Sequence, residues 1–246
     1  MSSTTLEADA TATGGVVRNN VSLLKSGKYS DMRLETSDGK VYHLHRSIVC
    51  SQSKPLAAFM DGNFQEAQTG TISLFHDDPQ AIEKLVDFLY KSEYSYDVKQ
   101  LPKPSFPSTT ATETASNETL LHTKVYVLAE KYDVPALKTL ASQHFKTCLP
   151  RNVLTNAFVE SLEIIFTQTP ETDRLLKDIA LEFVGKNYRR LSNIAEFIDL
   201  CKQNGDVAGE VIRTISTVPA LADDSGGWKY LVIILLITLY SFYKDP

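Results

Sequence analysis

Alternation of apolar and polar residues, the pattern of a half-buried β-strand, is confined to the first third of this chain. It occurs over residues 41–45 and again over residues 71–75. A stretch around Leu34 precedes the first of these, and the Asp38-Gly39 turn between them predicts a hairpin of two short strands. Tyr42 and Leu44 would then share one face of the hairpin. Because later apolar repeats have helical spacing, the sequence predicts a small sheet in a mainly helical α+β protein.

The helical signals are strongest after residue 78. Asp78-Pro79 predicts a helix start, because aspartate accepts hydrogen bonds from unpaired amides and proline fits the first turn. Apolar residues then recur at positions i, i+3, i+4 and i+7, which indicates a buried helix face formed by Ile82, Leu85, Val86 and Leu89. Shorter helices are predicted at 46–52 and 55–60, two consecutive helices follow between 121 and 145, and the pattern is helical from Arg151 onward.

These patterns divide the chain into segments. The first residues lack bulky apolar side chains, and a later stretch combines three prolines with a Ser/Thr-rich run. The predicted organisation is a disordered leader at 1–20, a mixed domain at 25–148 with a flexible insertion at 101–117, a helical extension at 151–218 and an apolar tail at 225–246.

Charge and cysteine content exclude several classes of protein. The net charge of -5 leaves no overall positive field to hold a phosphate backbone, so direct nucleic-acid binding is not expected. Cys50, Cys148 and Cys201 are too far apart for a zinc ribbon or a disulfide framework, and they are interpreted as reduced thiols. Since the first 20 residues also lack the pattern of a secretion signal, an intracellular protein of the cytoplasm or nucleus is expected.

The C-terminal tail leaves two interpretations open. Residues 230–240 are almost entirely apolar, with Trp228 before them and no charge until Lys244. A bilayer-spanning helix needs roughly 20 apolar residues, and this run is shorter. It is interpreted first as a buried terminal segment or a gene-model artefact, and second as a short membrane anchor over 228–243 with aromatic interface residues.

Several motifs together resemble the BTB/POZ family, in the form found in fungi. They are the Ser30-Asp31 strand start, the His45-Arg46 helix start, the Phe64-x-Glu66 loop, the Asp78-Pro79 helix start and the helix end at 129–132. The resemblance extends over about 120 residues, in the order that the family shows. It implies a BTB/POZ fold, in which helical hairpins flank a small mixed sheet, with Asp31 and His45 as structural anchors.

The resemblance implies protein association, without an active site or cofactor. Many relatives are adaptors for cullin-based ubiquitin ligases, while others serve in nuclear transcription complexes. A homodimerising scaffold or adaptor is the preferred hypothesis, and a nuclear scaffold and a membrane-tethered interaction domain are the alternatives. The helical extension contains no zinc finger or repeat signature, so it supplies no separate target-reading module of the type common in adaptors.

The resemblance also suggests two candidate interfaces. Phe64-Gln65-Glu66 is similar to the hydrophobic-x-Glu loop through which relatives contact a cullin, although Phe64 could instead fold onto the core. The positions where the family's first helix and strand pack in dimers correspond here to Leu23, Leu24, Met32 and Leu34. Packing within one chain is the alternative for these four residues.

A catalytic or metal site is less well supported by the residues. Asp31 could orient the His45 ring, and His45 could act as a general base. Ser47 lies in no nucleophile motif, however, so a hydrolase is the least favoured hypothesis. His43 and His45 would lie on one strand near Cys50, yet a closed zinc site needs four ligands. No catalytic, metal or cofactor residue is therefore predicted.

Overall fold

The structure is a computed structural model that describes residues 4–96, 112–151 and 155–217. These residues form the mixed α+β architecture predicted from the sequence, with a small sheet followed by a helical region. The chain divides into two compact units. The first comprises Met1–Tyr96 and Lys124–Ala141, and the second comprises Asp97–Thr123 and Ser142–Pro246. Each unit is described by itself below.

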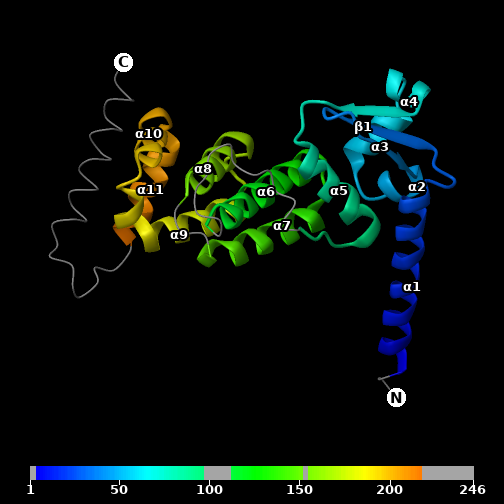
Figure 1. Ribbon diagram of the computed structural model, residues 1–246, viewed down its shortest axis with the longest axis horizontal. Helices are drawn as coiled ribbons and strands as arrows, with labels where there is room; N and C mark the ends of the chain where they lie inside the picture. The colour runs from blue at the N-terminus through cyan, green and yellow to red at the C-terminus, as the bar shows by residue number, and fades with distance from the viewer. Residues whose placement is uncertain (1–3, 97–111, 152–154, 218–246) are drawn as a thin grey trace. The chain divides into compact units, whose positions relative to one another are not determined.

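Helix α1 (Thr4–Ser26) begins the first unit (Figure 1). It covers most of the 1–20 range for which the sequence predicts a disordered leader, so the structure differs from that prediction. Alanines at 8, 10 and 12 favour this helix, whereas Gly14 and Gly15 oppose it, so intrinsic propensity alone does not explain its formation.

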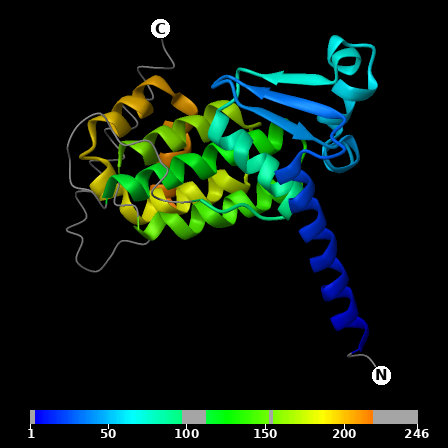
Figure 2. The same ribbon diagram turned by 45° about the vertical axis from the view of Figure 1, so that its right-hand side comes forward.

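The sheet contains three strands in the order β2-β1-β3. Strand β1 (Met32–Thr36) pairs antiparallel with β2 (Val41–Leu44) and parallel with β3 (Thr71–Leu74), which confirms the predicted hairpin and the later strand. Gly39 has a φ of 82°, the left-handed conformation that the Asp38-Gly39 turn requires. Helices of the first unit cover one face of the sheet, and the other face is open in Figure 2.

Alternation places the core side chains on the covered face. Met32, Leu34, Leu44, Ile72 and Leu74 are all buried, whereas the intervening positions on the strands are exposed or half-buried. The surrounding helices are α2 (Arg46–Val49), α3 (Lys54–Asp61), α4 (Gln65–Thr69) and α5 (Pro79–Lys91).

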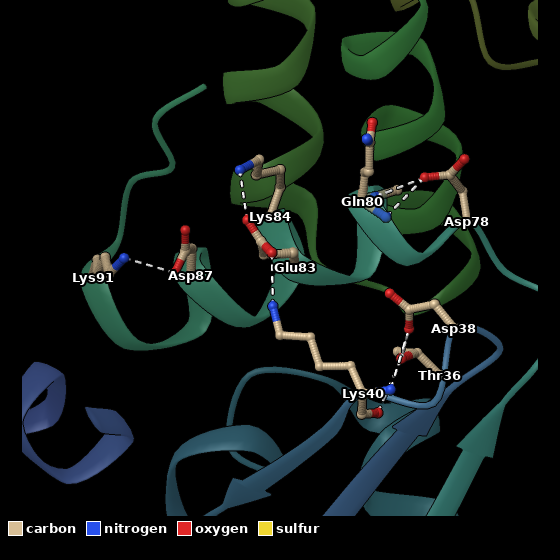
Figure 3. Close-up of polar contacts among 10 residues, drawn as sticks. Thr36, Asp38, Lys40, Asp78, Gln80, Glu83, Lys84, Asp87 and Lys91 are labelled. Carbon is tan, nitrogen blue, oxygen red and sulfur yellow. Dashed lines mark hydrogen bonds and ion pairs between the residues drawn. The ribbon is translucent and has the colours of Figure 1, made fainter. Parts of the chain in front are cut away.

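Helix α5 begins where the sequence predicts. One carboxylate oxygen of Asp78 accepts hydrogen bonds from the amides of Gln80 and Ala81 at 2.9 and 3.0 Å, as Figure 3 shows. All four members of its predicted apolar stripe are buried. The hairpin is tied to this helix by Lys40, whose Nζ lies 2.8 Å from Glu83 Oε2.

Two further helices, α6 (Thr112–Lys131) and α7 (Pro135–Cys148), contribute residues to both units. In the first unit, the Tyr132 hydroxyl donates to Asp77 at 2.6 Å, and the Ser53 hydroxyl donates to the Tyr132 carbonyl at 2.6 Å. Of the insertion predicted at 101–117, residues 112–117 are helical, which differs from the prediction, and the remainder lies outside the described residues.

The second unit is helical throughout its described part. It contains the 3-10 turn η2 (Leu149–Arg151) and the helices α8 (Asn156–Gln168), α9 (Leu175–Leu191), α10 (Ala195–Gln203) and α11 (Gly205–Thr217). The rings of Phe158 and Phe183 join α8 to α9 in an edge-to-face contact with centroids 5.0 Å apart. The buried ammonium of Lys177 donates to the Pro170 carbonyl at 2.8 Å.

The apolar tail at 225–246, including the candidate anchor at 228–243, lies outside the described residues. Among the helices that are described, none combines the length and apolar character needed to span a bilayer.

Candidate protein-interaction site

The loop between α3 and α4 presents an aromatic side chain to solvent. Phe64 is 62% exposed, so its side chain is not part of the hydrophobic core. Its ring lies close to the backbone of Gly62, where a Cβ atom would come within 2.7 Å of Phe64 Cδ2 and 3.0 Å of the Ala58 carbonyl oxygen. Glycine at position 62 therefore allows the Phe64 ring to lie against the end of α3.

Glu66 lies two residues further on, beside a hollow. The hollow has a volume of about 360 Å³ and is lined by Gln65, Glu66, Thr69, Thr71 and Ser73. Within the described part of the chain, no hydrogen bond or ion pair engages the Glu66 carboxylate. The loop thus presents an exposed aromatic ring and an unpaired carboxylate, a combination that suits docking of a protein partner.

The two helices that flank the loop are held by defined contacts. At the start of α3, the Ser53 hydroxyl accepts from the Leu56 amide at 3.2 Å and caps the helix. At the end of α3, next to the loop, the Arg46 guanidinium donates to the Met60 carbonyl. Gly70, with a φ of 66°, ends α4 and directs the chain into β3. These contacts position Phe64 and Glu66 on an ordered framework.

His45 is buried, and both ring nitrogens have partners. Nε2 lies 2.7 Å from the Lys28 carbonyl oxygen, and Nδ1 lies 2.8 Å from the Tyr90 hydroxyl. The same hydroxyl accepts from the His45 backbone amide at 2.8 Å. A single tautomer, with the proton on Nε2, satisfies all three contacts. Burial raises the pKa of Tyr90 to about 12, which keeps its hydroxyl protonated.

Asp31 contacts the residues at the end of β2 and the start of α2. Its carboxylate accepts from the Arg46 backbone amide at 2.7 Å, and its own amide donates to the Leu44 carbonyl at 3.1 Å. It therefore joins the start of β1 to the start of α2. Asp31 and His45 both form hydrogen bonds within the first unit, which favours the structural role expected for them. Tyr90, the partner of His45, was not predicted from the sequence, although a tyrosine on a core-facing helix signals a need for a hydrogen-bond partner.

The four candidate dimer residues separate into two pairs. Met32 and Leu34 are 2% and 1% exposed within the single chain, so they offer almost no surface to a second copy. Their side chains alternate onto the covered face of the sheet. Leu23 and Leu24 on α1 are only partly buried, and they are the two of the four that have surface to contact another chain.

The side chain of His45 has structural partners. Its ring nitrogens are engaged by the Lys28 carbonyl and the Tyr90 hydroxyl, and neither Asp31 nor Ser47 is among these described contacts. Over the ranges that the structure describes, no group of three or more His, Cys, Asp or Glu side chains is arranged to hold a metal ion. Burial raises the pKa of the Cys50 thiol and raises that of Cys201 to about 12, which disfavours reactive thiolates.

The first unit combines a small mixed sheet, helices on one face and an exposed aromatic loop. Residues 21–104 match the model of the BTB/POZ domain family, so the chain contains a BTB/POZ domain. This finding supports the resemblance seen in the motifs, and BTB/POZ domains bind protein partners. A search of curated proteins found no match to the chain.

Proposed function

We propose that the BTB/POZ domain of this protein is an adaptor that docks a cullin through the loop containing Phe64 and Glu66. The observation that carries the proposal is the exposure of Phe64, a large apolar side chain outside the core. Exposed aromatic residues are enriched among the anchors of protein interfaces. The unpaired carboxylate of Glu66 would orient the partner beside this anchor.

We further propose that the BTB/POZ unit extends beyond the family match to about residue 148. The extension is supported as far as residue 141, because Lys124–Ala141 belong to the first unit and Lys124 Nζ lies 2.9 Å from Oδ2 of Asp78, the residue that caps α5. Homodimerisation through Leu23 and Leu24 on α1 is part of the same proposal. Their partial exposure supports it.

The docking proposal is tested by titrating a purified cullin N-terminal domain against the full chain. Phe64→Ala combined with Glu66→Ala should weaken binding by more than about tenfold, because truncating an interface anchor typically costs about 2 kcal/mol. Tyr29→Ala is the matched control, since Tyr29 is also an exposed aromatic of the first unit but lies outside the loop. It should leave the affinity unchanged.

Two results would contradict the proposal in different ways. If the unmodified chain does not bind the cullin domain, the partner class is wrong. If it binds and the double variant binds equally well while its circular dichroism spectrum is unchanged, docking uses another surface. A loss of binding in the Tyr29 control of the same size as in the double variant would also remove the case for the loop.

A further inference from the structure

The hollow beside Glu66 is lined entirely by polar residues. Its volume of about 360 Å³ lies near the lower end of the roughly 300–1,000 Å³ that is usual for ligand pockets. Such pockets are lined mainly by apolar side chains, whereas the lining here consists of Gln65, Glu66, Thr69, Thr71 and Ser73. The hollow therefore suits one charged or polar side chain better than an apolar ligand.

Helix α4 and strand β3 bring these side chains together. Ile72 and Leu74 are buried, so the alternate residues Thr71 and Ser73 direct their side chains to the open face of the sheet. Gly70, in the left-handed conformation, ends α4 and starts the turn into β3. The strand thus supplies two hydroxyl groups to the hollow, and the short helix supplies the carboxylate.

The hydrogen-bonding groups of the lining are mainly acceptors. The Thr71 hydroxyl donates its hydrogen to the Thr69 carbonyl at 3.4 Å, so its oxygen can only accept from a ligand. The Glu66 carboxylate offers two acceptor oxygens and no donor. The best match is therefore a group with several N–H donors.

The charge of the lining also favours a cation. Glu66 is only partly exposed, and none of the other four lining residues carries a charge. Arg33 is registered with Thr71 on the neighbouring strand, but it is not among the residues that line the hollow. Because a carboxylate that is partly removed from water is stabilised by a counter-ion, a cation from a partner would be favoured at this position.

We propose that the hollow receives an arginine side chain of the protein that docks at the loop containing Phe64 and Glu66. The inference rests on the docking proposed above and adds the chemistry of the partner. A guanidinium has five N–H donors in a planar fork, which can pair with both oxygens of Glu66 and still reach a hydroxyl of β3. It is also more weakly hydrated than the ammonium of lysine, so it loses less on leaving water. Arginine and aromatic residues are both enriched among interface anchors, and Phe64 lies two residues before Glu66.

Titration of the full chain with N-acetylarginine methylamide, followed by nuclear magnetic resonance, tests the hollow without a protein partner. The derivative should shift the backbone amide resonances of Thr69, Thr71 and Ser73. The matched probe is the citrulline derivative, which has nearly the same shape as arginine but no charge. The arginine derivative should bind about fivefold more tightly, which is the size of effect expected for one ion pair near a protein surface.

Two variants show whether Glu66 causes this preference. Glu66→Gln should remove it, whereas Glu93→Gln should preserve it, because Glu93 is an exposed residue of the first unit outside the hollow. Equal affinity for the two derivatives, shifts confined to other residues, or an unchanged preference in Glu66→Gln would overturn the proposal. Tighter binding of the corresponding lysine derivative would overturn the choice of a guanidinium.

Filling the hollow from within the chain tests whether the docked partner uses it. Ser73→Arg places a guanidinium beside Glu66 and should weaken binding of the cullin N-terminal domain by about fivefold. Val41→Arg is the matched control, because Val41 is 44% exposed on the same face of the sheet but lies on β2, at the opposite edge. It should leave the affinity unchanged. Equal cullin affinity in the unmodified chain and Ser73→Arg would overturn the placement of the partner's arginine in the hollow.

The two titrations separate failure of this inference from failure of the docking proposal. If the unmodified chain prefers arginine to citrulline but does not bind the cullin domain, the choice of a cullin as partner is wrong and the arginine site stands. If the cullin domain binds through Phe64 and Glu66 but the chain shows no preference for arginine, docking stands and the arginine site is wrong.

Discussion

Replacing Tyr90 with phenylalanine should destabilise the first unit through His45. The hydroxyl removed is the partner of both the His45 backbone amide and its Nδ1 atom, each at 2.8 Å. Tyr90 is 1% exposed and His45 is 6% exposed, so water cannot easily replace the lost contacts. The phenyl ring itself keeps nearly the same packing, which isolates the hydrogen-bonding effect.

The expected magnitude follows from the two groups that are orphaned. Each buried polar group without a partner costs about 1–3 kcal/mol, and removal of the buried hydroxyl recovers part of that cost. We therefore expect a loss of about 2–4 kcal/mol in the free energy of opening this unit. Because every 1.4 kcal/mol is a factor of ten in an equilibrium constant, protection should fall by roughly 30- to 1,000-fold.

Native-state hydrogen exchange of the β1 amides is the appropriate assay, since it reports local opening without requiring the whole chain to unfold in one step. Tyr29→Phe is the matched control, because Tyr29 is 76% exposed. It should leave protection unchanged. A change below about 0.5 kcal/mol in Tyr90→Phe, with the control also unchanged, would refute the claim that His45 depends on this hydroxyl for its hydrogen bonds.

Two further predictions concern α5 and alkaline pH. Asp78→Ala should lower the free energy of unfolding, measured from the urea midpoint, by about 1–2 kcal/mol, because the Gln80 and Ala81 amides lose their cap. Asp78→Ser should retain most of the wild-type stability, since serine can also cap a helix. Equal losses in the two variants would contradict the capping role. Stability should fall from about pH 10 to 12, since burial raises the pKa of Tyr90 to about 12 while an unfolded tyrosine ionises near 10. The unfolded state then releases its proton first, so Tyr90→Phe should show a shallower decline in urea midpoint with pH, and an identical decline would contradict this assignment.

Local signals predicted much of the first unit. The Asp38-Gly39 turn and the Asp78-Pro79 helix start are encoded within a few residues, and both form as predicted. The helix over 4–20 was not predicted, because this segment has few apolar residues and contains the helix-disfavouring pair Gly14-Gly15. Tyr90 was missed as the partner of His45 because the two residues are 45 positions apart, and no local pattern links them.

The candidate interaction site also combines a motif visible in the sequence with features that only the tertiary structure sets. Phe64-x-Glu66 is visible in the sequence, but whether Phe64 packs inward or faces solvent depends on how the end of α3 approaches the loop at Gly62. The order of the strands was likewise decided by the tertiary structure, because β3 joins β1 only after a crossover through α2, α3 and α4. An alternating strand has the same sequence pattern at the edge or the centre of a sheet.

By itself, the sequence determined the fold class, the hairpin turn, the cap of α5 and the motifs of a BTB/POZ domain, because these features arise from propensities and contacts between near neighbours. The tertiary structure alone decided that Phe64 is exposed, that Met32 and Leu34 are enclosed by their own chain, and that β1 is the central strand of the described sheet. Exposure is a property of what surrounds a residue, and for these residues the surroundings come from distant parts of the chain.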